Sequence, residues 1–447
     1  MMGGSGSLAD TIAAIATPQG RGGIGIIRIS GEKAVDIALK LCQREKPLIP
    51  RFAHFQHWYD ARGESLDHGI TLYFQGEKSY TGEDTIELQA HGSPILLQAL
   101  FERLLELGCR AAEPGEFTRR AVEHGKIDLS QAEAVVACID AATLRAAKQA
   151  QKQLDGALGR RIAQYMDDLT SIIAHVEACL DFPEDEVPEL FYEQLRQRVE
   201  KELIQPINAQ LNSKLGERLF EGATIAIVGE PNVGKSSLFN ALSGRDRAIV
   251  TDIAGTTRDT LELDFEVGGI PVRLTDTAGL RATDDVVEQE GVKRAKDAAK
   301  TADLVIFVAD ATRPETWDSQ THFQDIHIHL RVMNKVDQAD VSQAGFLPLS
   351  IKQEQGLDTL IDLMAEQLGS FDLADAAAMV TSSRHRVALQ QALTHIQTGL
   401  DMLGQESMID LTAMEWRRAW SSLGEILGIG DVELILDKVF SEFCIGK

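Results

Sequence analysis

One segment near the middle of the chain constrains the fold more than any other. Thr224–Val228 predicts a short buried strand, Gly229–Ser236 fits the pattern G-x-x-x-x-G-K-S, and Ser237–Leu242 predicts a helix directly afterwards. Glycines let a backbone wrap around phosphate groups, and a helix N-terminus directs amide N–H groups at them. We therefore expect Lys235 to reach the β- and γ-phosphates of a nucleotide and the hydroxyl of Ser236 to bind Mg²⁺.

Three segments further along indicate which nucleotide is bound. Asp276–Gly279 (Asp-Thr-Ala-Gly) ends a predicted strand, where the carboxylate is suited to organising metal-bound water and the glycine amide to sensing a γ-phosphate. Val305–Asp310 predicts a core strand, and Asn334–Asp337 then fits N-x-x-D. A carboxylate at Asp337 accepts hydrogen bonds from N1 and the exocyclic amine of guanine, which adenine does not offer. This order and spacing predict GTP.

The segment Thr251–Asp259 lies between the phosphate loop and Asp276. A threonine here completes the shell of Mg²⁺ only while a γ-phosphate is present, which is how such loops switch. Small GTPases place a water-orienting Gln directly after Asp-Thr-Ala-Gly, but this chain has Leu280. Either hydrolysis is absent or another group positions the water. Glu288 is the best local candidate, with a solvated surface charge as the alternative reading.

Composition limits the partners and the compartment. The 447 residues carry a net charge of -24, so a nucleic acid has to be met at a local basic patch or through a second protein. The five cysteines are scattered without C-x-x-C spacing, which favours small buried side chains in a reducing compartment; Cys444 differs by its place near the end. The sequence predicts no signal peptide and no membrane span, and therefore a cytoplasmic protein.

The texture of the chain predicts alternating types of domain. Residues 8–125 read as α+β, 128–215 as helical, 223–368 as a parallel α/β unit, and the remainder as helical again. Helical material on both sides of one α/β unit suggests an insertion. The predicted strands are 24–29, 69–74 and 85–88, and the predicted helices are 93–107, 189–215, 382–404, 411–427 and 431–442.

The strand before Asn334 has an unusual pattern. His327, His329 and Arg331 alternate with apolar residues instead of forming a continuous apolar run. Alternation of this kind is typical of a strand at a sheet edge or with one exposed face.

Several further strings resemble the MnmE (TrmE) family of tRNA modification GTPases, and the resemblance covers residues 8–447. Together with the GTPase motifs they carry the resemblance, and the terminal string is the most specific of them. The strings are Ala16-Thr17-Pro18, Gly20–Gly25, Tyr80–Asp84, Pro114–Thr118, Gly125–Leu129, Asp181-Phe182-Pro183 and Phe443–Lys447.

The resemblance implies a multidomain α/β and α architecture. It places an N-terminal α+β folate-binding and dimerisation domain at 1–125, a helical domain at 126–220 and 379–447, and an inserted Ras-like P-loop G domain at 221–378. It also implies a homodimer through the N-terminal domains, with G domains that pair when GTP and potassium are bound.

The resemblance assigns the nucleotide site residue by residue. It implies that K⁺ binds Asn232, Thr251, Ile253 and Thr256, that Mg²⁺ binds Ser236 and Thr257, and that Glu288 orients the attacking water. Ser350-Ile351-Lys352 stands where guanine-contacting loops more often read Ser-Ala-Lys. The expected GTP contacts are Asn232, Val233, Gly234, Lys235, Ser236, Ser237, Thr251, Asp252, Ile253, Ala254, Gly255, Thr256, Thr257, Asp276, Thr277, Ala278, Gly279, Asn334, Lys335, Asp337, Ser350, Ile351 and Lys352.

The same resemblance implies a second binding site and the overall function. Arg28, Glu87, Lys126 and Lys447 are implied to line a pocket for a tetrahydrofolate derivative (5,10-methylene- or 5-formyl-tetrahydrofolate), and Cys444 is a catalytic candidate by family position. With the FAD-dependent partner MnmG, in a heterotetramer or larger complex, the family adds an aminomethyl-type group to the wobble uridine of tRNA.

Two other functions stay open from the residues. A GTP-dependent ribosome or RNA assembly factor should carry a basic RNA-binding domain, which the acidic surplus disfavours. A purely structural or membrane-remodelling GTPase is disfavoured because the predicted helices are short and broken.

Overall fold

The structure is a computed structural model of the chain, and it describes residues 10–181, 189–244, 265–275, 296–318, 323, 325–339, 341, 343–369, 380–405, 408–430, 436, 437, 439, 440, 443 and 446. Contacts divide the chain into two compact units. One comprises the described residues up to Val136 and from Leu427 onward, and the other comprises the described residues between Ala137 and Ile426. This division is coarser than the predicted domains, whose boundaries stay predictions.

The first unit contains a six-stranded sheet in the order β3-β4-β5-β2-β1-β6. Neighbouring strands are antiparallel except β1 and β6, which are parallel. The predicted strands at 24–29, 69–74 and 85–88 are confirmed within this sheet. Its strands are β1 (Ile12–Ile15), β2 (Gly22–Ser30), β3 (His54–Tyr59), β4 (Ser65–Phe74), β5 (Thr85–Gly92) and β6 (Arg110–Ala111).

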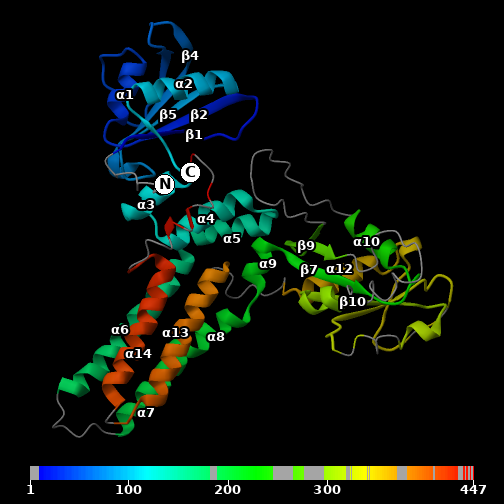
Figure 1. Cartoon of the computed structure of the whole chain (residues 1–447). Helices are drawn as coiled ribbons and strands as arrows, with labels where there is room; N and C mark the ends of the chain where they lie inside the picture. The colour runs from blue at the N-terminus through cyan, green and yellow to red at the C-terminus, as the bar shows by residue number, and fades with distance from the viewer. Residues whose placement is uncertain are drawn as a thin grey trace. The chain divides into compact units, whose positions relative to one another are not determined.

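Helices α1 (Ala34–Leu41) and α2 (Pro94–Glu106) pack on this sheet, and α2 confirms the helix predicted at 93–107 (Figure 1). Side chains alternate between the faces of a strand. In β2, Ile27 and Ile29 are fully buried in the core with the two helices, while Arg28 points to the other face and stays partly exposed. The α3 (Glu116–Glu123) and α4 (Leu129–Asp140) helices follow in the chain.

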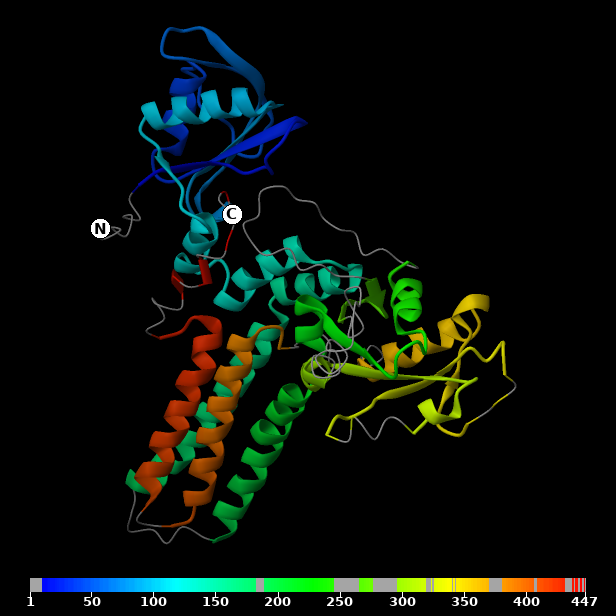
Figure 2. The same ribbon diagram turned by 45° about the vertical axis from the view of Figure 1, so that its right-hand side comes forward.

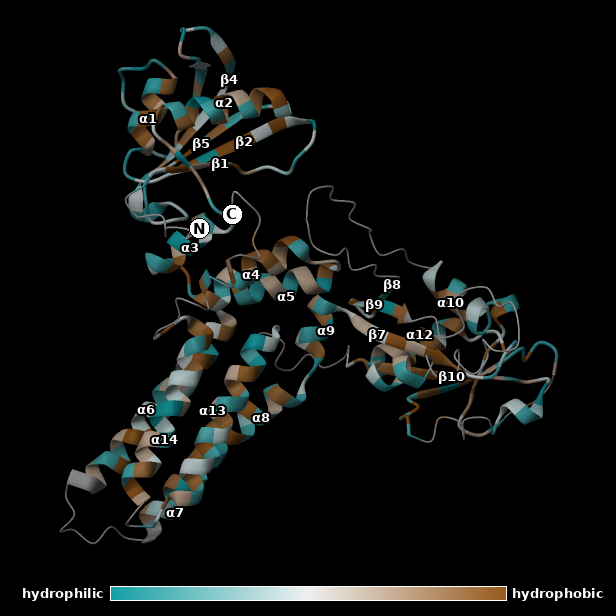
Figure 3. Cartoon of the chain, viewed as in Figure 1, coloured by the Kyte–Doolittle hydropathy of each residue, from teal (hydrophilic) through white to brown (hydrophobic). Residues whose placement is uncertain are grey.

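The second unit contains a group of helices formed by segments on both sides of an α/β unit. Figures 1 and 2 show α6, α13 and α14 running side by side, and Figure 3 shows polar and apolar residues mixed along each of them. Mixed faces of this kind bury one stripe and expose the other. The helices are α5 (Leu144–Leu154), α6 (Ala157–Asp181), α7 (Glu189–Val199), a π-helical segment (Glu200–Ile204), α8 (Gln205–Asn212), α9 (Leu215–Glu221), α13 (Ser383–Met402) and α14 (Ile409–Leu427).

These helices confirm the helical character predicted from residue 128 onward and the helices predicted at 382–404 and 411–427. The predicted 189–215 helix is instead interrupted by the π-helical turn and ends at Asn212. The predicted 431–442 helix falls largely outside the described residues. Within the part of the chain that the structure describes, no helix combines the length and apolar character needed to cross a membrane.

The α/β unit is built on a second six-stranded sheet in the order β12-β11-β10-β7-β9-β8. Every neighbouring pair is parallel except β8 and β9, as the alternation of strands and helices predicts. Its elements are β7 (Ala223–Val228), α10 (Lys235–Ser243), β8 (Phe265–Val267), β9 (Ile270–Thr275), β10 (Leu304–Asp310), β11 (Leu330–Asn334), β12 (Leu347–Pro348) and α12 (Leu357–Gln367).

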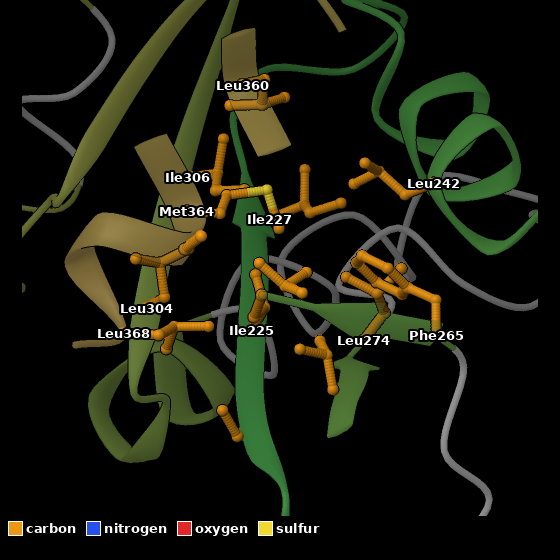
Figure 4. Close-up of a cluster of buried hydrophobic side chains, with 14 of the residues drawn as sticks. Ile225, Ile227, Leu242, Phe265, Leu274, Leu304, Ile306, Leu360, Met364 and Leu368 are labelled. Carbon is orange, nitrogen blue, oxygen red and sulfur yellow. The ribbon is translucent and has the colours of Figure 1, made fainter. Parts of the chain in front are cut away.

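Both faces of this sheet are buried. Ile225 and Ile227 of β7 pack with Leu242 of α10 and Met364 of α12 on one face (Figure 4). Residues of β7 and β10 that point the other way, such as Phe307, form a separate cluster on the second face. A central strand covered on both faces needs a continuous apolar run, and this explains why β7 and β10 were recognisable from the sequence.

The alternating segment before Asn334 is not an edge strand. His327 and His329 precede the strand, which begins at Leu330, and its last three residues are buried. The short strand β12 pairs with Val332 and Met333 on the outer side. The edge prediction is therefore wrong, because a two-residue strand from later in the chain covers this position. The prediction of partial exposure is right for the first half of β11.

Candidate functional site

The phosphate loop lies between β7 and α10, next to the ends of β10 and β11. Helix α10 begins at Lys235, and Gly234 precedes it in a left-handed conformation with φ of 107°. A Cβ on Gly234 would lie 2.2 Å from Nδ2 of Asn334, and a Cβ on Gly229 would lie 2.3 Å from the carbonyl oxygen of Val308. Only glycine fits at either position without displacing its neighbours.

The carbonyl groups of this loop are bound by side-chain donors. Each carbonyl from residue 229 to residue 233 accepts a hydrogen bond from a side chain. The pairs are Lys235 Nζ with Gly229 O (2.9 Å) and Glu230 O (2.8 Å), Arg313 Nη1 with Pro231 O (3.2 Å), Lys335 Nζ with Asn232 O (3.0 Å), and Asn334 Nδ2 with Val233 O (2.9 Å). In a trans peptide the N–H that follows a carbonyl points the opposite way. The amides of Asn232, Val233 and Gly234 therefore point away from the Arg313, Lys335 and Asn334 side chains that bind the preceding carbonyls, and backbone N–H groups of such a loop can bind phosphate.

The residues present therefore fit a nucleotide phosphate with Mg²⁺. The ammonium group of Lys235 rests on two neutral carbonyl oxygens, and an anionic phosphate oxygen is a stronger acceptor than either. Ser236 lies in the first turn of α10, where the helix dipole also favours negative charge.

The two predicted base-recognition segments are joined to each other. Asn334 ends β11 and is 3% exposed, and its Oδ1 accepts from the N–H of Ile351 at 3.5 Å. Oγ of Ser350 donates to a carboxylate oxygen of Asp337 at 2.7 Å. Ser350 also caps the short turn that contains Ile351 and Lys352. The structure thus brings residues 232–237, 334–337 and 350–352 together at the carboxyl edge of a parallel sheet, where ligands bind in open α/β folds.

The remaining predicted nucleotide and ion residues lie outside the described residues, and so do two predicted residues near the C-terminus. They are Thr251, Asp252, Ile253, Ala254, Gly255, Thr256, Thr257, Asp276, Thr277, Ala278, Gly279, Glu288, Cys444 and Lys447.

In the first unit, the predicted residues Arg28 and Glu87 form a pair. They are register partners on β2 and β5, and Nη2 of Arg28 lies 2.9 Å from a carboxylate oxygen of Glu87. The guanidinium also lies 5.9 Å from the ring centre of Tyr80 and 5.7 Å from that of Phe117. An arginine between two rings and a carboxylate has a fixed planar orientation.

The predicted residue Lys126 does not join this pair. Its Nζ donates to the carbonyl oxygen of Glu77 at 2.6 Å, on the exposed surface. Arg28 therefore contacts Glu87, whereas Lys126 contacts the backbone of Glu77.

A buried arginine joins the two strings that contain Tyr80 and Phe117. Arg120 is 2% exposed and donates to both carboxylate oxygens of Glu83 and to Glu116. Burial alone raises the pKa of Glu116. Hydrogen bonds from Arg110, the Glu113 amide and Arg120 lower it by more than burial raises it, so the pKa lies below its usual value. The carboxylate of Glu116 is thus held in its ionised form.

The C-terminal segment packs against this same unit. A Cβ on Gly446 would lie 2.8 Å from the carbonyl oxygen of Ile15 at the end of β1, and a Cβ on Gly115 would lie 2.9 Å from Phe443. Phe443 shares a buried cluster with Leu129. The neighbours of Cys444 and Lys447 in the sequence therefore contact the N-terminal domain.

Two of the cysteines behave as small buried side chains. Burial raises the pKa of Cys42 to about 11 and that of Cys109 to about 12, so neither is a reactive thiolate near neutral pH. Cys138 is only half-buried, which corrects the expectation that it belongs to a core.

Sequence reasoning missed four residues of these sites. Tyr80 and Phe117 were noticed only as parts of strings, and Asp310 and Arg313 were given no role. Paired aromatics around an arginine leave no local pattern, because their ring contacts cross long stretches of sequence. A charged residue ending a fully apolar strand, as Asp310 does, is a signal that could have been used.

Comparison with known proteins accounts for nearly the whole chain. Residues 11–126 match the family model described as the GTP-binding protein TrmE N-terminus, and residues 129–444 match the MnmE helical domain. A tRNA modification GTPase MnmE from Aquifex aeolicus is 42% identical over 450 residues, which cover 98% of this chain and 100% of that protein. The chain belongs to the MnmE family.

Other relatives agree. Proteins of the same name from Acinetobacter baumannii and Chromobacterium violaceum are 43% and 41% identical, each over 98% of both chains. Among solved structures, Era from Aquifex aeolicus bound to GDP and AlF4⁻ matches with a TM-score of 0.25 and 17% identity, over 50% of this chain and 99% of that chain. A score this low adds nothing to the family assignment.

Proposed function

We propose that this chain binds GTP with Mg²⁺ at the edge formed by β7, β10 and β11 and hydrolyses it to drive a step of tRNA modification. The observation that supports this best is the set of five consecutive loop carbonyls held by side-chain donors, with the guanine-type carboxylate of Asp337 fixed by Ser350 beside them. Lys235 would hold the β- and γ-phosphates, and Ser236 and Thr257 would hold the metal.

The test is nucleotide binding and turnover by the full chain. Fluorescent GDP should bind and be displaced by GTP but not by ATP. Binding of ATP with equal affinity would refute the role of Asp337.

The chemistry of hydrolysis is proposed to use potassium. Asn232, in its left-handed conformation, would ligate K⁺ together with Thr251, Ile253 and Thr256, which supplies the positive charge that an arginine finger gives elsewhere. Glu288 would orient water in place of the missing Gln. Equal GTP turnover in potassium and in sodium would refute the ion site.

A second proposed site binds a tetrahydrofolate one-carbon donor in the N-terminal domain. The Arg28–Glu87 pair offers donors and an acceptor beside the rings of Tyr80 and Phe117, which suits a flat heteroaromatic ligand. The packing of Gly446 against Ile15 supports a contribution from the tail, including Lys447. Lys126 would join the pocket, and Cys444 would act as a catalytic residue.

Calorimetry with 5-formyl-tetrahydrofolate tests the folate site. The wild type should bind and Arg28→Ala should lose most of the affinity, while Arg51→Ala should bind as the wild type does. Arg51 is a matched control because its side chain donates to the carbonyl of Lys78 at an exposed position. Absence of binding to the wild type would remove the proposed site.

The assembly is proposed to be a homodimer that works with MnmG in a heterotetramer or larger complex on tRNA in the cytoplasm. Folate would supply the carbon for an aminomethyl or carboxymethylaminomethyl group on the wobble uridine. Wobble-uridine analysis of tRNA from cells lacking this chain tests the assignment. Normal modification together with a ribosome defect would favour the alternative, a GTP-dependent assembly factor.

A further inference from the structure

Asp310 is a buried carboxylate at the edge of the nucleotide site. It is the last residue of β10 and the register partner of Asn334 on β11, so both residues lie at the carboxyl ends of adjacent parallel strands. Its relative exposure is 0%. A strand made otherwise of apolar residues therefore ends in a charge that has no access to water.

The position of this carboxylate is rigidly determined. The N–H of Asp310 donates to Oγ1 of Thr316 at 3.0 Å, and its carbonyl accepts from Nε1 of Trp317 at 2.8 Å. Oδ1 accepts from the N–H and the hydroxyl of Thr312 at 2.9 and 2.7 Å. Oδ2 accepts from Nζ of Lys335 at 2.5 Å. One oxygen is thus used to fix the side chain and the other to hold a cation.

The ammonium group of Lys335 links the Asp310 carboxylate to the phosphate loop. Nζ of Lys335 also donates to the carbonyl oxygen of Asn232 at 3.0 Å. Both residues have left-handed backbones, with φ of 65° at Lys335 and 66° at Asn232, and left-handed φ is uncommon outside glycine. The Lys335 side chain therefore joins the carboxylate of Asp310 to the carbonyl of Asn232. Both Lys335 and Asn232 have a backbone conformation that neighbouring contacts must stabilise.

Stability alone is a poor explanation for this ion pair. The carboxylate of Asp310 loses its hydration, while the side chain of Lys335 stays 31% exposed; apolar side chains of similar volume often stabilise a core as well as such a pair or better. Burial alone raises the pKa of Asp310, but Lys335 and Thr312 lower it by more than burial raises it, so the pKa lies below its usual value. Asp310 thus stays charged at a position where its relative exposure is 0%.

We propose that Asp310 is a positioning residue for nucleotide binding: it holds Lys335 on the carbonyl of Asn232 and so sets the phosphate loop in its binding conformation. The proposal rests on the proposed nucleotide site and not on the potassium or folate sites. Asp310 itself does not contact the nucleotide.

The test uses Asp310→Asn in the full chain, with Asp303→Asn as the matched control. Asp303 precedes the same strand at its opposite end and also holds an ion pair, since it accepts from Nε of Arg218 and from the N–H of Thr224, each at 3.0 Å. Both variants should lower the melting temperature. Loss of one charge-assisted hydrogen bond should weaken binding of fluorescent GDP about tenfold in Asp310→Asn alone.

Steady-state kinetics separate positioning from catalysis. Asp310→Asn should raise the KM for GTP and leave kcat at saturating GTP close to wild type, whereas Asp303→Asn should leave both unchanged. GDP affinity in Asp310→Asn equal to that of the control would overturn the proposal. Failure of the wild type to bind GDP would instead refute the proposed nucleotide site.

A double-mutant cycle shows whether Asp310 acts through Lys335. Lys335→Met should weaken GDP binding, and adding Asp310→Asn should cause no further loss. If the two losses multiply, Asp310 acts by another route and the proposal fails. The same holds if Lys335→Met alone binds GDP as tightly as wild type, a result that stays informative even if Asp310→Asn does not fold.

Discussion

Replacing Arg120 by Met is expected to destabilise the N-terminal domain strongly. The guanidinium is 2% exposed and donates to the carbonyl of Asp10, to both oxygens of Glu83 and to Glu116. Without it, Glu116 keeps the hydrogen bonds from Arg110, whereas Glu83 keeps the one from the Ser30 hydroxyl. Removing one partner of a buried ion pair costs about 3–5 kcal/mol.

The adjacent arginine is the matched control. Arg119 lies on the same helix and pairs with Glu123 and Asp437, but its side chain is 27% exposed. Exposed pairs contribute at most about 1 kcal/mol, so Arg119→Met should change stability little. The two variants remove the same group from neighbouring positions and differ mainly in burial.

Native-state hydrogen exchange on peptides from β2 and β5 measures the effect in this domain alone. A loss of about 3 kcal/mol corresponds to exchange more than 100-fold faster in Arg120→Met. Equal protection in Arg120→Met and Arg119→Met would refute the reasoning that burial of the uncompensated carboxylate sets the cost.

Three other predictions follow from the sites. Asp337→Asn should lose affinity for GDP and gain affinity for xanthosine diphosphate, whose ring carries a carbonyl where guanine has an amine; unchanged GDP binding would contradict the role of Asp337. Gly234→Ala should abolish GDP binding, because its Cβ would meet the side-chain amide of Asn334, whereas Gly345→Ala, with nothing within 4 Å, should bind GDP normally. The pKa of Glu116 is lowered in the folded state, so the stability that its ionised form contributes is fully present above pH 4.5, its ordinary pKa, and is lost as the pH falls through the folded-state pKa. Hydrogen exchange measured at decreasing pH should show this loss of stability. The pH-dependent loss should be smaller in Arg120→Met.

Much of the α/β unit could be predicted because its signals are local. The strand, the glycine-rich loop and the helix at residues 224–242 are adjacent in sequence, and continuous apolar runs such as 305–309 identify strands buried on both faces. The alternation at His327 and His329 led to the wrong prediction of an edge strand. The strand that pairs with the outer side of β11 consists of residues 347 and 348, and no pattern near Asn334 indicates this pairing.

The candidate sites divide in the same way. Lys235 and Asp337 were named from short motifs whose chemistry depends on neighbouring residues. Arg28 and Glu87 were named only by family resemblance, since 59 residues separate them and only the pairing of β2 with β5 joins them.

The sequence by itself predicted a phosphate-binding loop and a guanine-contacting carboxylate at Asp337, and it determined that Leu280 stands where small GTPases carry a Gln. Only the tertiary structure decided what holds that loop. Asp310 and Lys335 are 25 residues apart and Lys335 and Asn232 are 103 apart, so their contacts depend on the order of parallel strands in the sheet. Local propensities specify strands and turns, but strand order arises from burying all of them at once, and it brings these charges to one edge.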